Sequence, residues 1–216
     1  SSASGTNDPF QGTVEAESRI EALLQSESNK FPLSWSSDGK YLLYAALVPG
    51  TKSDLWILPI DSIEKGKAGT PFPFAITEVE EREGAFSPDG HWIVYVSDET
   101  GAPEVYVRSF VPPANGSSVS SGAKIRVSRG GGIHPRWSRD GKELFYSAPD
   151  GRLMAVAVSG SDALRLDEPR TLFSMAPNTV WDVGSDGKRF LVGVPIEENA
   201  QAPFAVVMNW MEGLKR

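Results

Sequence analysis

Hydrophobic and polar positions follow a pattern that returns four times along the chain. A short apolar segment, an Asp-Gly pair and a longer apolar segment occur in "LSWSSDGKYLLYAAL", "GAFSPDGHWIVYVSD", "PRWSRDGKELFYSAP" and "WDVGSDGKRFLVGVP", which begin at Leu33, Gly84, Pro135 and Trp181. Apolar side chains two residues apart share one face of a strand, and the filled alternate positions indicate that the other face is buried too. The pattern therefore predicts strands packed between neighbouring sheets.

Further segments complete each repeat. An apolar strand follows at 54–60, 104–110, 152–158 and 204–210, and a shorter one precedes each repeat, from Ala22, Pro73, Ile125 and Arg170. The units run over 22–60, 73–110, 125–158 and 170–210, with four strands each and turn-forming Pro and Gly at the joints. Such repetition predicts an all-β fold, a β-propeller of four antiparallel four-stranded blades. The aromatic residues Trp35, Phe86 and Trp137 are expected to pack between neighbouring blades.

The repeated Asp-Gly pairs have a local explanation. A tight turn between two strands needs a residue that tolerates positive φ, which Gly supplies, and the preceding Asp can accept hydrogen bonds from nearby backbone N–H groups. We interpret these as structural turn residues rather than as metal ligands or catalytic groups: Asp38, Gly39, Asp89, Gly90, Asp140, Gly141, Asp186 and Gly187.

The two ends of the chain leave the closure of the propeller open. Residues 1–18 are polar and read as a disordered linker, so that the propeller domain covers 19–216. No outer strand follows the third strand of the last unit, whereas the short strand at the front of the first unit is spare. The N-terminal strand could thus seal a closed four-blade ring. Alternatively, the chain could form the last four blades of a larger propeller with exposed strand edges.

Composition excludes some classes of function. The formal net charge is −7 and no basic stripe is present, which argues against nucleic-acid binding. Cysteine is absent, so disulfides, thiol nucleophiles and thiolate zinc sites are excluded. The sequence has no apolar run long enough to span a bilayer, so we expect no membrane insertion by this segment.

Motifs of catalysis are also missing from the sequence. It contains no glycine-rich phosphate loop, no kinase catalytic loop and no Gly-x-Ser-x-Gly elbow. His91 and His134 are too far apart in the repeat to form a zinc triad or an acid–base pair. The glycine run 130–132 and the acidic segment 77–84 are interpreted as a loop and as a solvated surface, although a calcium site or docking patch at the latter stays open. We therefore expect no catalytic activity, no metal and no cofactor.

Binding is expected on one rim of the propeller. The connections from outer to inner strands and from second to third strands meet at that rim, and ligand sites concentrate on loops held by a rigid scaffold. The candidate ligand-binding residues on these connections are Arg82, Glu83, Asp98, Glu99, His134, Arg136, Trp181 and Asp182.

The repeats resemble a known family. The segments "FPLSWSSDGKYLLYAA" with "DLWILPID", and "REGAFSPDGHWIVYVSDETGAPEVYV", are similar to the TolB-like or WD-repeat-like propeller repeats of bacteria. Residues 81–108, 130–156 and the ending "VVMNWMEGLKR" resemble the C-terminal propeller of acidobacterial serine/threonine kinase-related proteins. That resemblance implies an extracytoplasmic or periplasmic sensor or binding module for a protein, peptide or small ligand.

Two alternative functions stay open at this point. Similar propellers accompany the catalytic domain of prolyl-oligopeptidase-like serine peptidases, which would make the chain an accessory propeller. A purely structural unit that self-associates through its blade edges is the other alternative.

Overall fold

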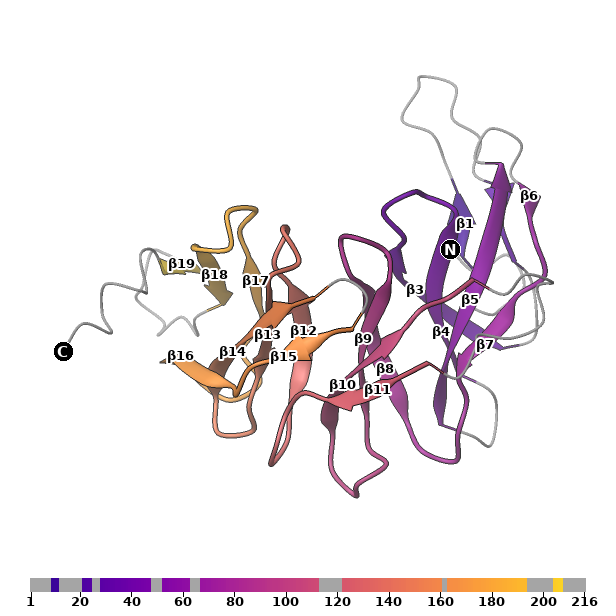
Figure 1. The fold of residues 1–216 in the computed structure, drawn as a ribbon. Helices are drawn as coiled ribbons and strands as arrows, with labels where there is room; N and C mark the ends of the chain where they lie inside the picture. Colours follow the sequence, from indigo (N-terminus) through magenta and orange to yellow (C-terminus); the bar gives the residue numbers. More distant parts are fainter. Residues whose placement is uncertain are drawn as a thin grey trace.

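Four antiparallel sheets stand side by side as the blades of a propeller (Figure 1). The structure is a computed structural model, and it describes residues 9–11, 21–24, 28–47, 52–62, 67–112, 122–160, 163–193 and 204–207. Every regular element of this part of the chain is a strand, which confirms the predicted all-β propeller.

The strands of each blade follow one another from the inner to the outer edge. Blade 1 contains β3 (Asn29–Trp35), β4 (Tyr41–Leu47), β5 (Ser53–Ser62) and β7 (Phe72–Ala75), with β6 (Lys67–Ala68) paired to the end of β5. Blade 2 contains β8 (Glu81–Phe86), β9 (Trp92–Ser97), β10 (Glu104–Ser109) and β11 (Lys124–Arg126). Blade 3 contains β12 (Ile133–Trp137), β13 (Glu143–Ser147), β14 (Arg152–Ser159) and β16 (Arg170–Ser174), with β15 (Arg165–Leu166) on β14. Blade 4 contains β17 (Trp181–Val183), β18 (Phe190–Gly193) and β19 (Phe204–Val207).

The short strand that opens each sequence unit completes the sheet of the preceding unit. β7 pairs with β5, β11 pairs with β10 and β16 pairs with β14, all antiparallel. Sequence units and blades are therefore offset by one strand, as the spare N-terminal strand suggested.

The N-terminal strand does not seal the last blade. β2 (Glu21–Ala22) pairs with β1 (Phe10–Gln11), and Leu23 packs on the face of blade 1 with Leu42, Tyr44 and Leu58. Blades 1 and 4 lie at opposite ends of the row of sheets (Figure 1). The closed four-blade ring, one of the two forms expected, is thus not the form seen, and the blades form an open arc. Residues 10 and 11 of the predicted linker belong to β1, and 1–8 and 12–18 lie outside the described residues.

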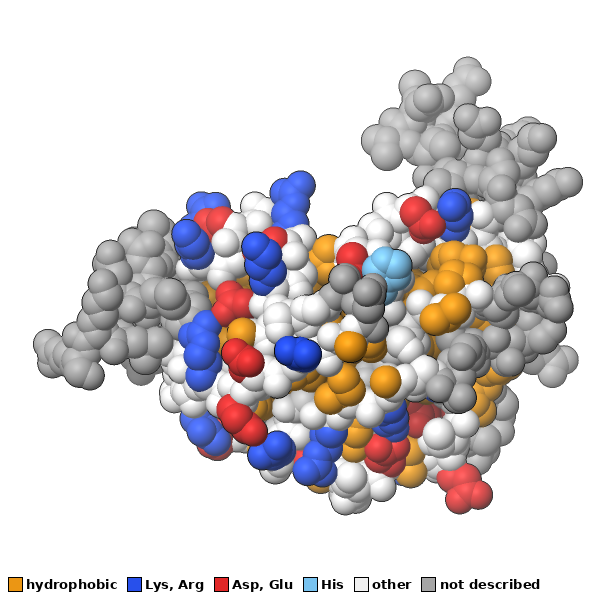
Figure 2. Space-filling view, viewed as in Figure 1, with side chains coloured by type: hydrophobic (Ala, Val, Ile, Leu, Met, Phe, Trp, Pro, Cys, Tyr) orange, Lys and Arg blue, Asp and Glu red, His pale blue; other side chains and the backbone are white. Residues whose placement is uncertain are grey.

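Three hydrophobic layers hold successive blades together. Leu43 and Ile57 of blade 1 meet Ile93 and Tyr95 of blade 2, and the same arrangement recurs between blades 2 and 3 and between blades 3 and 4. These layers arise because successive residues of a strand point to opposite faces and both faces are apolar. On the outward side, charged side chains gather over blades 3 and 4 and hydrophobic ones over blades 1 and 2 (Figure 2).

The Asp-Gly turns have one geometry. The four Gly residues have φ between 67° and 75°. In the first turn the Ser36 hydroxyl donates to Asp38 Oδ1 (2.7 Å), which also accepts from the backbone N–H of Lys40 (3.1 Å). Asp89, Asp140 and Asp186 each accept the equivalent backbone N–H. The hydrogen bond from Ser36, followed by that from Lys40, holds the pKa of Asp38 below its usual value.

Candidate functional site on the inner strands

A β-bulge interrupts the inner strand at an equivalent place in three blades. The register shifts between Pro32 and Ser34 in β3, between Arg82 and Ala85 in β8, and between Ile133 and Arg136 in β12. Bulges bend a strand and redirect its side chains, and they occur often beside active sites. The repeat thus places one redirected residue on each of these inner strands.

Two of the bulge residues have an unfavourable backbone conformation. Glu83 has φ of 56° and His134 has φ of 54°, and neither is glycine. A side chain in this left-handed region costs about 1 kcal/mol, and such strain is concentrated at functional sites. Pro32 occupies the corresponding position of blade 1, where the proline ring excludes positive φ.

Glu83 and His134 also contact each other across the junction of blades 2 and 3. The backbone N–H of His134 donates to Glu83 Oε2 (2.5 Å), and His134 Nε2 lies 3.8 Å from Glu83 Oε1. Arg82 Nε lies 3.4 Å from the same oxygen, and Arg82 Nη1 lies 3.8 Å from Glu80 Oε2. The structure therefore brings three of the predicted ligand-binding residues into one cluster.

A second pair continues the charged row toward blade 4. Arg136 Nε lies 4.0 Å from Asp182 Oδ1, and both side chains are exposed. Ion pairs of this kind contribute less than about 1 kcal/mol to stability because solvent screens them. Their charges thus stay accessible to a polar ligand or to a partner's side chains.

Asp98 and Glu99 lie farther out on the same rim. Asp98 accepts from the backbone N–H of Glu80 (2.8 Å) and from Lys52 Nζ (3.1 Å), and these two bonds hold its pKa below the usual value. Asp98 is therefore joined to the Arg82 cluster through Glu80. Glu99 pairs instead with Lys124 of the outermost strand β11.

Trp181 does not reach the rim surface. Its side chain is only 5% exposed in the layer between blades 3 and 4, and its Nε1–H donates to Ser147 Oγ (2.7 Å). The indole therefore supports the inner strand that carries Asp182.

The acidic segment 77–84 is only partly a solvated surface. Glu81 is 1% exposed, and its Oε1 accepts from the Thr77 hydroxyl (2.6 Å). Burial raises the pKa of Glu81, and the hydrogen bond from Thr77 offsets only part of this effect. The expectation of a solvated carboxylate is wrong at this position, because Glu81 is buried and bonded to Thr77.

The inner strand of blade 1 carries a row of exposed apolar side chains that the sequence analysis missed. Phe31, Leu33 and Trp35 of β3 are 43%, 36% and 44% exposed. Trp35 was expected between two blades. Its counterpart Phe86 is buried in the layer that blade 2 forms with the preceding blade 1. Blade 1 is the first blade in the described arc, so no described blade covers Trp35 in the same way. The apolar sequence "FPLSW" on an inner strand was the available signal.

Other kinds of site were sought in the part of the chain that the structure describes. There, no three His, Asp or Glu side chains are grouped so that they could hold a metal ion. The same residues include no helix with the length and apolar character needed to cross a membrane.

Known structures share this architecture. A scan against protein-family models and a search of curated proteins found no match. TolB from Acinetobacter baumannii matches with a TM-score of 0.59 at 16% identity, over 88% of this chain and 44% of its own. The chain has a TolB-like propeller fold.

Two enzymes are among the neighbours with this TolB-like fold. The periplasmic gluconolactonase PpgL of Pseudomonas aeruginosa matches with a TM-score of 0.59 at 19% identity, over 81% of this chain and 53% of its own. An oligogalacturonate lyase in complex with manganese matches with a TM-score of 0.55 at 15% identity, over 90% and 55%. The chain spans about half the length of these three proteins.

These neighbours contradict the expectation that the chain is not an enzyme. That expectation relied on missing kinase and hydrolase motifs, whereas the same fold carries a lactonase and a lyase. It also relied on the separation of the two histidines. In the structure, His134 of blade 3 contacts Glu83 of blade 2, although the two residues are 51 positions apart in sequence. A histidine can therefore have an acidic neighbour from the adjacent blade.

Proposed function

We propose that the inner strands of this TolB-like propeller bind a segment of another protein. The apolar side chains of Phe31, Leu33 and Trp35 would receive its hydrophobic residues, and the charged row on blades 2 to 4 would orient its polar ones. The observation that supports this most is the exposure of three large apolar side chains on one inner strand. Aromatic residues and Arg are the residue types that supply most binding energy at protein interfaces.

The charged row favours an amphipathic partner over a purely apolar one. Arg82, Glu83, Arg136 and Asp182 alternate in sign along neighbouring inner strands. Alternating charges contribute little to stability but select a partner with complementary charges and reject like charges. An extended segment with an apolar end and a mixed-charge end fits both parts of the surface.

Peptide selection tests this proposal. Peptides selected from a random library on the wild-type chain are expected to lose about tenfold in affinity with Leu33→Ser and with Arg136→Ala, the loss expected for one interface anchor. Val111→Ser is the matched control, because Val111 is exposed and apolar but lies outside β3. If the selected peptides bind the Leu33 and Arg136 variants as tightly as the wild type, the inner strands are not the binding surface.

The proposal extends to a sensor role on the extracytoplasmic side of a bacterial membrane. The resemblance to kinase-related propellers supports such a role, and PpgL is a periplasmic neighbour of the same fold. A cellular reporter of the signalling response would test the sensor role, with the native gene carrying either Leu33→Ser or Val111→Ser. Leu33→Ser should abolish the response, and Val111→Ser should leave it unchanged.

Acid–base catalysis at Glu83 and His134 is a second candidate function. Two strained residues in contact at one bulge position are what favours it, together with the enzymes among the neighbours. In lactone hydrolysis His134 would take a proton from the attacking water while Glu83 holds the imidazole in place. The rate of gluconolactone hydrolysis tests this role. Activity of the wild type that is lost in both His134→Gln and Glu83→Gln would support it, and equal rates in the wild type and the variants would exclude it.

A further inference from the structure

The junctions between successive blades repeat one pairing of side chains. The last residue of each inner strand lies opposite a residue of the second strand, and both belong to the face that meets the preceding blade. These pairs are Phe86 with Ile93 in blade 2, Trp137 with Leu144 in blade 3 and Val183 with Phe190 in blade 4. The preceding blade packs against all three pairs.

The same pair in blade 1 is not covered by a described blade. Trp35 lies opposite Leu42, so its indole belongs to the face of blade 1 that points away from blade 2. Trp35 is 44% exposed, whereas its counterpart Phe86 is 6% exposed. On the same face, Leu23 packs over the second and third strands with Leu42 and Leu58. The open part of the face therefore lies along the inner strand, around Trp35.

The other end of the arc has an open face of the opposite kind. Five residues after the Asp of each Asp-Gly turn, an apolar side chain of the second strand points to the following blade. In blades 1 to 3 this side chain is fully buried, and the residues are Leu43, Val94 and Phe145. In blade 4 it is Leu191, which is 46% exposed because no described blade follows.

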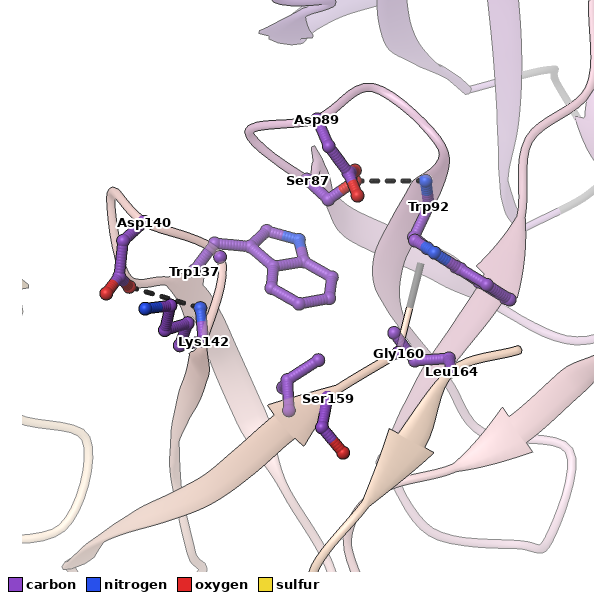
Figure 3. Close-up of a pocket in the computed structure, with 11 residues that line it drawn as sticks. Ser87, Asp89, Trp92, Trp137, Asp140, Lys142, Ser159, Gly160 and Leu164 are labelled. Carbon is purple, nitrogen blue, oxygen red and sulfur yellow. Dashed lines mark hydrogen bonds between the residues drawn. The ribbon is translucent and has the colours of Figure 1, made fainter. Parts of the chain in front are cut away.

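The junction of blades 2 and 3 shows how two such faces pack. The indole N–H of Trp137 in blade 3 donates to Ala85 O of blade 2 (3.3 Å). Figure 3 shows this indole directed toward Trp92 of blade 2. Trp35 takes the place of Trp137 in the repeat, and Asp182 of blade 4 takes that of Ala85. If blade 4 of one copy lay before blade 1 of another, the Trp35 indole would meet the backbone carbonyl of Asp182.

A second position of that junction changes in the same sense at both ends of the arc. Glu83 and His134, which are in contact between blades 2 and 3, lie six residues before the Asp of their turns. Val180 and Pro32 occupy this position in blades 4 and 1, and both are exposed. A polar residue thus meets a polar residue within the arc, and an apolar residue would meet an apolar one between two copies.

We propose that a second copy of this chain covers both open faces, with blade 4 of each copy packed against blade 1 of the other. Head-to-tail contacts of this kind close into a ring when the rotation between copies allows it. Two arcs of four blades give eight, within the usual range of about four to eight for propellers. The inference rests on the proposed function, because it names a second copy as the protein whose segment the inner strand of blade 1 binds.

The length of the structural neighbours agrees with this arrangement. TolB, PpgL and the oligogalacturonate lyase carry the same fold in chains about twice as long as this one. An arc of this length therefore corresponds to about half of such a protein, and a second copy would supply the rest.

Light scattering on the eluting chain tests the inference, because it measures molar mass as a function of concentration. The wild type is expected to form dimers, and Trp35→Asp and Leu191→Asp should each raise the dissociation constant more than about tenfold. A mixture of these two variants should regain dimers, because each variant keeps the face that the other has lost. Val111→Asp is the matched control, since Val111 is exposed and apolar but belongs to blade 2.

Cysteine cross-linking keeps the test decisive if an aspartate variant does not fold. The chain contains no cysteine, so a variant with both Pro32→Cys and Val180→Cys carries two thiols only, at opposite ends of the arc (Figure 1). Oxidation should join its copies into covalent dimers. A variant with Val111→Cys and Val180→Cys is the control and should stay monomeric under the same conditions.

Three results would overturn the inference: a wild-type chain that is monomeric at its highest soluble concentration, dimers that persist in both aspartate variants, or equal cross-linking in the control pair. A monomeric chain whose selected peptides still lose affinity with Leu33→Ser would overturn the second copy and leave the proposed function in place. Dimers that ignore Trp35→Asp, together with peptides that ignore Leu33→Ser, would overturn both.

Discussion

Replacing His134 with glycine should leave the fold almost as stable as before, although an inner strand is a poor place for glycine. Glycine in a strand usually costs about 0.5–1 kcal/mol because the unfolded chain gains freedom. At His134, where φ is 54°, the change to glycine also removes about 1 kcal/mol of left-handed backbone strain, and this gain offsets the cost. The lost contact between the imidazole and Glu83, at 3.8 Å, is partly exposed and contributes less than about 1 kcal/mol.

The control is a neighbour on the same strand. Arg136 belongs to β12 and is absent from the residues with positive φ, so Arg136→Gly should cost the full amount of about 1 kcal/mol. For a chain of this size that difference lowers the melting temperature of Arg136→Gly by about 2–4 °C relative to His134→Gly. Urea unfolding gives the free energies and thermal unfolding the melting temperatures.

Equal losses in the two variants would refute the reasoning. They would mean that the backbone at His134 relaxes to an ordinary conformation when the side chain is absent, so that no strain is stored there. If the expected difference is found, the site retains a histidine where glycine would serve the fold equally well, and this favours a role in binding or catalysis.

Two further predictions concern the layers between blades. Phe110→Val should lower the free energy of unfolding by about 2–3 kcal/mol, because the ring packed between Tyr41 and Phe86 is lost. Urea unfolding measures this change. A loss below about 1 kcal/mol would contradict the packing described for the ring. Glu81→Gln should stabilise the fold at pH 7 and not at pH 4. Burial raises the pKa of Glu81 in the folded state, so the ionised carboxylate lowers stability as the pH rises above its ordinary value, and glutamine removes that loss. Glu80→Gln is the matched control, and an equal gain of Glu81→Gln at both pH values would show that the buried carboxyl is not responsible.

The sequence predicted the parts of the fold that depend on local chemistry. The alternating apolar positions gave strands such as Trp92–Ser97 in the correct place, and the Asp-Gly pairs gave the turns. The offset of one strand between units and blades also followed, because the repeats fix which strand is left over. The partner of the N-terminal strand stayed open between two alternatives, because it depends on whether the blades close into a ring, which the local pattern does not encode.

The sequence predicted where the residues of the candidate site lie along the repeat, but only part of the contacts between their side chains. Equivalent places in the repeat located Glu83, His134 and Arg136 on one rim, and the structure adds the bulges that redirect them. Burial of Trp181 and exposure of Trp35 were beyond the sequence, since both depend on which neighbouring blade covers them.

Hydrogen exchange with a selected peptide bound tests the central proposal most directly. The proposal predicts slower exchange of backbone amides in β3, β8 and β12 and unchanged exchange at the Asp-Gly turns of the opposite rim. Protection confined to those turns, or to the outer strands β11 and β16, would contradict binding on the inner strands.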